Sequence, residues 1–156
     1  MENKLFDTLE KLDIKYEMVD HEAVFTCEQA EFVKGLIDGT ACKNLFLKNK
    51  KHEYFLYVLP DDQRADLKKL GKENGLGNLS FAGEQDLWDM LKLKTGGVTP
   101  LGIINDENSA VKVLLSKDLE GKKVLLHPNT NTATVSLEFD DLIKFIKYER
   151  NDYALV

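Results

Sequence analysis

Residues 44–59 read NLFLKNKKHEYFLYVL, and the class of the fold follows from this stretch. Two runs rich in aromatic and aliphatic side chains, 44–48 and 54–59, flank the polar turn Asn49-Lys50-Lys51. This arrangement is typical of a β-hairpin. Pro60-Asp61-Asp62 closes the second run. The hairpin is therefore the first structural unit that the sequence predicts.

Helical periodicity surrounds the hairpin on both sides. Leu5, Leu9 and Leu12 repeat on one face of an expected N-terminal helix. Thr26 and Gln29 form a capping-box pattern that opens a second helix ending near residue 35. Further helices are expected at 64–73, 84–93 and 138–148, and strands at 16–19, 101–105, 111–115 and 122–126. Hairpin-spaced strands mixed with helices predict a single α+β domain over residues 1–156, with a mixed, mostly antiparallel, twisted or barrel-like sheet and surrounding helices.

Composition narrows the class of protein. A chain of 156 residues with 43% hydrophobic content is near the size at which one domain buries about two-thirds of its unfolded surface. No apolar run approaches the roughly 20 residues needed to cross a bilayer, so we expect a cytoplasmic protein without membrane contact. The dispersed histidines and the two cysteines form no HExxH or CxxC pattern, so we expect no metal and no cofactor.

Charge is distributed unevenly along the chain. The net charge of −6 argues against general affinity for nucleic acid, DNA included. Residues 43–72 nevertheless hold eight Lys and Arg against four Asp and Glu. Such asymmetry suits a protein that touches an RNA end with one face, and the same residues also suit an ordinary solvated hairpin and helix.

Three polar segments follow or precede predicted strands: Cys42-Lys43-Asn44, Gly96 to Gly102, and His127 to Thr134. Functional groups often lie in such places because rigid strands hold the loop groups in position. Lys43, just before an apolar strand, offers a positive charge to a phosphate or a substrate oxygen. Gly96 and Gly97 lack a Cβ, so their backbone N–H groups can approach a ligand and stabilise an oxyanion. A strand-end surface lysine and a plain turn are the alternative interpretations.

His127 and Cys42 allow several kinds of chemistry. The imidazole of His127 can orient a ligand through one ring nitrogen or satisfy a backbone carbonyl at a strand end. Cys42 lacks the local signature of a nucleophile, and a small buried hydrophobe is the alternative. No GxSxG elbow is present. The residues by themselves thus define a candidate pocket and not a reaction.

Taken in order, these segments resemble the YbaK and prolyl-tRNA-synthetase-associated editing family, and most closely its free-standing, alanine-specific branch, called ProXp-ala. The likeness runs along almost the whole chain. It is carried by Val24-Phe25-Thr26, Lys43-Asn44-Leu45-Phe46-Leu47, Leu79-Ser80-Phe81-Ala82, Val98-Thr99-Pro100-Leu101-Gly102, and His127-Pro128 followed by Asn131 and Thr134.

The resemblance implies a hydrolase that removes alanine from tRNA for proline, with a ribose hydroxyl of the substrate activating water. A prolyl pocket cannot strongly exclude the smaller alanine, since each missing methylene is worth only about 1 to 3 kcal/mol. The implied partners are aminoacylated tRNA for proline and, transiently, prolyl-tRNA synthetase. Deacylation of Cys- or Ser-charged tRNA, and tRNA binding without turnover, remain open as alternatives.

Site residues carried over from the family fall into three groups. The expected catalytic residues are Lys43, Gly96, Gly97, Val98 and Thr99. The expected substrate contacts are Phe25, Asn44, Pro100, His127 and Asn131. The expected tRNA contacts are Lys48, Lys50, Lys51, Arg64 and Lys68.

Overall fold

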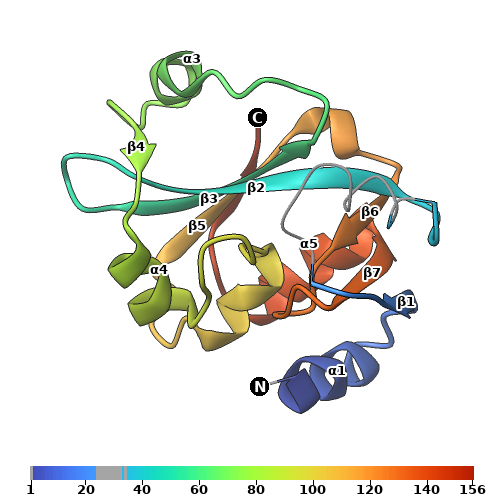
Figure 1. Ribbon diagram of the computed structural model, residues 1–156. Helices are drawn as coiled ribbons and strands as arrows, with labels where there is room; N and C mark the ends of the chain where they lie inside the picture. The colour runs from blue at the N-terminus through green and yellow to red at the C-terminus, as the bar shows by residue number, and fades with distance from the viewer. Residues whose placement is uncertain (1, 24–32, 34) are drawn as a thin grey trace.

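The predicted hairpin forms the centre of the computed structural model, which describes residues 2–23, 33 and 35–156 (Figure 1). Strands β2 (Thr40–Lys48) and β3 (Tyr54–Pro60) pair antiparallel. The side chain of Asn49 organises the turn, because its Oδ1 accepts hydrogen bonds from the backbone N–H groups of Lys51 and Glu53, each at 3.0 Å. The prediction of a hairpin is confirmed.

Further strands extend the hairpin on both sides. They are β1 (Tyr16–Asp20), β4 (Ser80–Phe81), β5 (Val111–Leu115), β6 (Lys123–Leu126), β7 (Ala133–Glu138) and β8 (Tyr153–Leu155). In the described part of the chain they make one eight-stranded sheet in the order β1-β7-β6-β2-β3-β5-β8, with β4 paired to β2. Four pairings are antiparallel and three are parallel. The mixed α+β architecture is confirmed.

Strand β2 changes its neighbour along one edge. At its start, residues 40–41 pair with β6, and at its end, residues 47–48 pair with β4. Between these two contacts, no strand among the described residues pairs with positions 42–45 on that edge. The sheet therefore opens in the middle of its central strand, and we call this opening the β2 gap.

Helices cover the sheet. They are α1 (Glu2–Lys11), α3 (Leu67–Glu73), α4 (Glu84–Leu91) and α5 (Phe139–Tyr148), with 3-10 helices η1 (Pro100–Asn105) and η2 (Lys117–Leu119). Helix α5 buries Phe139, Leu142 and Phe145 in one cluster with Leu5 and Leu9 of α1. The Lys144 ammonium also donates to the Leu12 carbonyl. No helix in this described set is long and apolar enough to cross a membrane.

The two faces of the hairpin enter different hydrophobic clusters, since successive side chains of a strand point to opposite faces. Phe46 and its paired residue Leu56 belong to the large cluster with α1, α4 and α5. Leu47 and its paired residue Phe55 belong to a smaller cluster that contains Leu70 of α3. We call these the core face and the α3 face of β2.

Four expectations about the elements need correction. Residues 101–105 are not a strand but most of η1, because the Thr99 hydroxyl caps the segment and Pro100 starts it with a fixed φ. The helix expected from residue 64 begins at Leu67, since Asp66 is its N-cap. The helix expected to reach 93 ends at Leu91, since Lys92 is left-handed. Lys43 lies within a strand rather than before one, because β2 starts at Thr40.

Strands β4, β7 and β8 were not among the predicted elements. The second helix, expected from Thr26, falls for the most part on residues 24–32, which lie outside the described residues.

Candidate functional site

A cavity of about 280 Å³ lies at the β2 gap. Its walls come from β2, from the loop before η1, from the end of β6 and from the start of β7. Among the described residues they are Val33, Ala41, Cys42, Lys43, Asn44, Asp61, Gly96, Val98, Leu125, Leu126, His127 and Thr134. The three polar segments singled out in the sequence therefore meet at one place.

Lys43 and Asn44 reach this cavity from opposite faces of β2. Asn44 pairs with Val58, whose side chain lies in the large cluster, so Asn44 points to the core face. Lys43 is its neighbour along the strand and points to the α3 face. The lining of the cavity thus includes an uncharged amide from the core face of β2 and a cation from the α3 face. Within the described residues the Lys43 ammonium makes no hydrogen bond or ion pair.

The Asn44 side chain has an unused acceptor. Its Oδ1 atom is buried and has no hydrogen-bond partner. Leaving a buried acceptor unsatisfied costs about 1 to 3 kcal/mol. The fold tolerates this cost at a cavity wall, where a ligand can supply the missing donor.

The His127 imidazole is held by the backbone. Its Nδ1 lies 3.2 Å from the Ala133 carbonyl oxygen, and because a carbonyl can only accept, Nδ1 carries the proton. Burial lowers the pKa of His127, partly opposed by the Ala133 carbonyl and reinforced by the nearby His21. The ring is therefore stabilised in its neutral form, with Nε2 left as an acceptor.

A second histidine supports the same wall. His21 follows β1, and its backbone N–H donates to the Thr132 carbonyl at 2.9 Å. Its Nε2 lies 2.9 Å from the Thr134 hydroxyl oxygen, and its Nδ1 lies 2.7 Å from the Glu22 carbonyl oxygen. The rings of His21 and His127 are 6.5 Å apart in an edge-to-face arrangement.

Cys42 has no features of a nucleophile. Burial raises the pKa of its thiol to about 12, and the Sγ–H donates to the Thr40 carbonyl at 3.4 Å. Reactive cysteines require a lowered pKa, since the thiolate is the attacking species. Cys42 serves as a packed wall of the cavity.

The glycine loop divides into a part that lines the cavity and a part that supports it. Gly96, with φ at +91°, and Val98 line the cavity. Thr99 is fully buried, and its Oγ1 accepts from the Leu101 N–H at 3.3 Å. This hydrogen bond fixes the loop to η1, so Thr99 supports the loop without lining the cavity.

Not every expected site residue lines the cavity. Lys43, Asn44, Gly96, Val98 and His127 do. Four other expected residues do not line the cavity as far as the structure describes it: Gly97, Thr99, Pro100 and Asn131. Phe25 lies outside the described residues. The five residues expected to contact tRNA lie apart from the cavity, in the hairpin, in α3 or just before α3. They are Lys48, Lys50, Lys51, Arg64 and Lys68.

Three polar residues near the cavity were not expected as site residues. Asp61 and Thr134 line it, and His21 contacts Thr134 from behind. Thr134 was quoted only as part of a motif. The pairing of β1 with β7 brings His21 to Thr134, and no spacing pattern in the sequence signals that contact.

The search for metal ligands covers residues 2–23, 33 and 35–156. Within these ranges no group of three or more His, Cys, Asp or Glu side chains is arranged to hold a metal ion.

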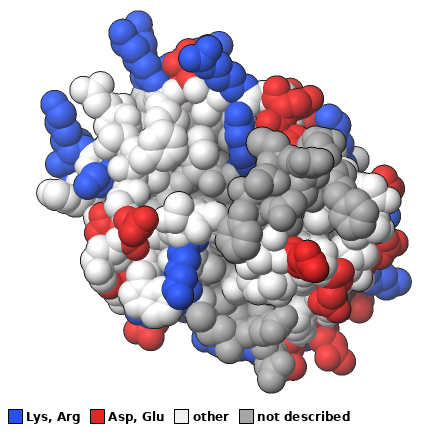
Figure 2. Space-filling view, in the orientation of Figure 1, with Lys and Arg blue, Asp and Glu red and all other residues white. Residues whose placement is uncertain are grey.

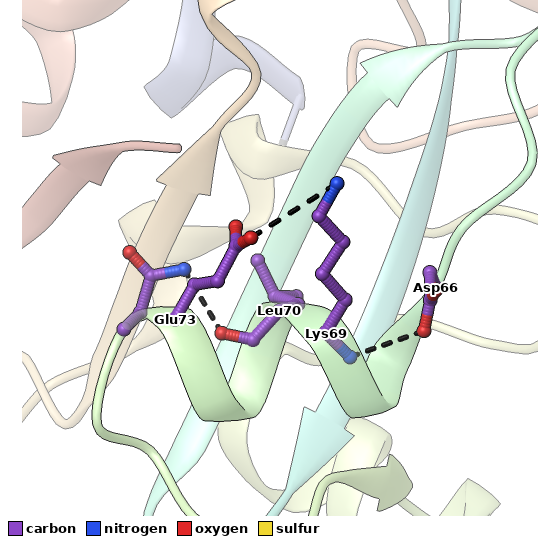
Figure 3. A network of polar contacts seen from close by, with 5 residues as sticks. Asp66, Lys69, Leu70 and Glu73 are labelled. Atoms are coloured by element: carbon purple, nitrogen blue, oxygen red, sulfur yellow. Dashed lines mark hydrogen bonds and ion pairs between the residues drawn. The ribbon is translucent and has the colours of Figure 1, made fainter.

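A basic surface covers α3 and the hairpin. Lys and Arg side chains gather at the upper left of Figure 2, over α3 and the hairpin, whereas Asp and Glu gather toward the lower right. Helix α3 is fixed by local contacts (Figure 3): the Asp66 carboxylate accepts from the Lys69 N–H at 3.0 Å, and the Lys69 ammonium lies 4.0 Å from the Glu73 carboxylate. Lys68, Lys69 and Lys72 line a shallow groove on this helix.

Comparison with known proteins gives consistent results. The family model for the aminoacyl-tRNA editing domain matches residues 21–145. The chain is 39% identical over 150 residues to the prolyl-tRNA editing protein ProX of Acetoanaerobium sticklandii, covering 95% of this chain and 92% of that protein.

It is 28% identical over 100 residues to the multifunctional Ser/Thr-tRNA deacylase ProXp-y of Escherichia coli, covering 62% of this chain and 60% of that protein. A solved structure described as a candidate trans-editing enzyme for prolyl-tRNA synthetase has the same fold. Its TM-score is 0.74 at 23% identity, with 99% of this chain and 94% of that chain covered.

Proposed function

The chain belongs to the family of aminoacyl-tRNA editing domains, and we propose that it hydrolyses the alanyl ester of mischarged tRNA for proline. At the level of the family, the protein is an aminoacyl-tRNA hydrolase, and its macromolecular partner is aminoacylated tRNA. The proposal also includes four finer statements. They are specificity for alanine, specificity for proline tRNA, a transient contact with prolyl-tRNA synthetase and a cytoplasmic location.

One observation carries the proposal: Lys43 and Asn44, whose side chains point to opposite faces of β2, both line the cavity at the β2 gap. An aminoacyl ester has two parts of opposite character, an anionic nucleotide end and a small aminoacyl group. We propose that the Lys43 ammonium, on the α3 face, holds the phosphate or the ribose oxygens of the terminal adenosine. The aminoacyl group then enters on the core face, between Asn44 and His127.

In the proposed reaction, water attacks the ester carbonyl carbon, and the neighbouring ribose hydroxyl relays the water proton to the leaving ribose oxygen. No protein side chain then has to change its protonation state. The contribution of the chain is to position the ester, and such positioning is worth several orders of magnitude in rate. The backbone around Gly96 and Val98 is proposed to hold the carbonyl and the water.

Size is the proposed basis for rejecting proline. The wall between Val98 and His127 would accept a methyl group and exclude a pyrrolidine ring, because overpacking costs about 1 to 3 kcal/mol and also misplaces the ester. His127→Ala should therefore permit measurable hydrolysis of Pro-tRNA. Complete rejection of proline by this variant, together with loss of alanine activity, would assign His127 to substrate orientation instead.

The seryl ester is a second candidate substrate. The unpartnered Oδ1 of Asn44 can accept a hydrogen bond from a seryl hydroxyl as well as from another donor. A deacylation panel on Ala-, Ser-, Cys- and Pro-charged tRNA for proline tests the proposal. We expect alanine to be removed fastest and proline to be retained. Equal inactivity on all four substrates would instead indicate a tRNA-binding module without turnover.

A further inference from the structure

We propose that Asn44 and Thr134 form a receptor for the protonated α-amino group of the substrate, and that His21 is a positioning residue that holds the Thr134 hydroxyl in the orientation this receptor needs. This inference rests on the proposed function and specifies how the same site recognises its substrate class. It adds His21 and Thr134 to the residues on which selectivity depends.

The hydrogen bonds of His21 determine what Thr134 presents to the cavity. Nδ1 of His21 faces the Glu22 carbonyl oxygen at 2.7 Å and must carry a proton, since a carbonyl cannot donate. In the neutral ring, Nε2 is then an acceptor, and the Thr134 hydroxyl at 2.9 Å must donate to it. The hydrogen of Thr134 is thus committed, and only its oxygen lone pairs remain for a ligand.

Three side chains of the cavity lining consequently offer acceptor atoms. Asn44 contributes a buried Oδ1 without a partner, and Thr134, 4% exposed, contributes its oxygen. His127 contributes Nε2, since its Nδ1 proton faces the Ala133 carbonyl. A wall made of acceptors is complementary to a group that carries several donors and a positive charge.

The α-ammonium group of an aminoacyl ester has this chemistry. It carries three N–H donors and is cationic at neutral pH, since an α-amino group has a pKa of about 7.7 to 8.0. Repulsion by Lys43 is limited because Lys43 points to the other face of β2. In this arrangement β2 separates the nucleotide, which faces Lys43, from the amino group, which faces the acceptor atoms.

The test compares two esters that differ at one group. Alanyl-tRNA for proline is converted by nitrous acid to lactyl-tRNA, in which a hydroxyl replaces the ammonium group and the methyl group is unchanged. The rate of each ester is divided by its spontaneous hydrolysis rate, since the ammonium group also affects intrinsic reactivity. For the wild type, we expect kcat/KM to be about 10- to 100-fold higher for the alanyl ester, in line with a hydrogen bond to a charged group.

Four variants and one control apply this comparison to the named residues. Thr134→Val and His21→Phe should each lower the alanyl-to-lactyl ratio about tenfold, with the loss mainly in KM. Thr134→Ser and His21→Gln, which keep a hydroxyl and a donor–acceptor pair, should retain most of the ratio. Thr132→Val makes the same chemical change at an exposed position outside the cavity lining and should leave the ratio as in the wild type.

A double-mutant cycle tests whether His21 acts through Thr134. The variant that combines His21→Phe with Thr134→Val should show no larger loss than either change alone. Thermal unfolding of each variant separates a loss of fold from a loss of recognition.

Each outcome decides a distinct question. A wild type that hydrolyses the alanyl and lactyl esters equally after normalisation, or variants that slow both esters by the same factor, would overturn the ammonium receptor while leaving the proposed function intact. Additive losses in the cycle would overturn the positioning role of His21. A wild type inactive on all charged tRNAs would overturn the proposed function and this inference with it.

Discussion

The cavity at the β2 gap and the basic surface over the hairpin and α3 differ in the physical means by which they would recognise a ligand. In the cavity, His127 is partly buried and its ring is held by the Ala133 carbonyl of β7, and Thr134 is buried and is held by His21, which follows β1. On the basic surface, Lys50 and Lys51 are exposed on the turn of the hairpin. One region has fixed donors and acceptors, and the other has mobile charges.

This difference separates selectivity from affinity. Fixed short-range hydrogen bonds distinguish one small ester from another and depend little on salt. Exposed cations attract any polyanion, and their contribution falls as the salt concentration rises. We therefore expect changes in the cavity to alter turnover and substrate choice, and changes on the basic surface to alter binding of all tRNA substrates alike.

The largest effect is expected at Lys43, the cation that lines the cavity. Lys43→Ala should lower kcat/KM for deacylation by about 10²-fold or more, since it removes the charge that positions the ester. The melting temperature should stay close to that of the wild type, because the ammonium group makes no contact that supports the fold in the described residues. Lys122→Ala, at an exposed lysine outside both the cavity and the basic surface, serves as the matched control. Wild-type turnover by Lys43→Ala would remove Lys43 from the site.

A substitution in α3 should affect the basic surface without reaching the cavity. A Cβ added at Gly71 would lie 2.1 Å from the Gly77 carbonyl oxygen, a backbone atom. Gly71→Ala should therefore displace α3 and lower the free energy of unfolding by about 1 to 3 kcal/mol. We expect a higher KM for tRNA with an unchanged kcat. A reduced kcat at saturating tRNA would show that α3 and the cavity are coupled.

Smaller effects are expected from the hairpin lysines. Replacing Lys50 and Lys51 by Gln should weaken tRNA binding a few-fold and reduce the slope of log Kd against log salt by roughly one per lost phosphate contact. The alanyl-to-lactyl ratio should not change. Binding measured at several salt concentrations tests this expectation, and an unaltered slope would assign the two lysines to solubility.

The smallest effect concerns pH. Burial lowers the pKa of His127 in the folded protein below the ordinary histidine value of 6.5, so the unfolded chain binds this proton first as the pH falls. The free energy of unfolding should therefore decrease as the pH falls from neutrality through 6.5 toward the lowered native value. In the His127→Gln variant, the free energy of unfolding should decrease less as the pH falls. Denaturant titrations of both proteins at pH 7.5 and pH 5.5 measure this difference. Parallel pH profiles for the two proteins would contradict this prediction.

Local patterns predicted the parts of the fold that local chemistry determines. The hairpin, α1, α4 and α5 carry their own periodicity or turn residues, so the sequence indicates them directly. The apolar run from residue 101 was assigned to a strand, because a short buried run has no periodicity that separates strand from helix. Its 3-10 helix begins at the Thr99 cap, and a Cβ at Gly102 would lie only 2.5 Å from the Leu93 side chain.

Site residues could be predicted where they lie within a sequence motif. They could not be predicted where their place in the site depends on the pairing of two strands. Lys43, Asn44 and His127 lie in motifs that the sequence shows, although the placement of Lys43 and Asn44 on opposite faces requires the register with β3. His21 reaches Thr134 only because β1 and β7 pair, a contact between residues 113 positions apart. No single-sequence pattern encodes such a contact.

The β2 gap also bears on how such a site can change over generations. The gap is bounded by the main chain, because it lies where the pairing of β2 with β6 ends and its pairing with β4 has not begun. The position of the gap is therefore set by strand pairing and not by single side chains. The walls, by contrast, are individual side chains such as Val98, His127 and Thr134. Mutations there can alter the accepted ester one step at a time while the sheet keeps its pairing. A scaffold of this kind is mutationally robust in architecture and evolvable in substrate choice.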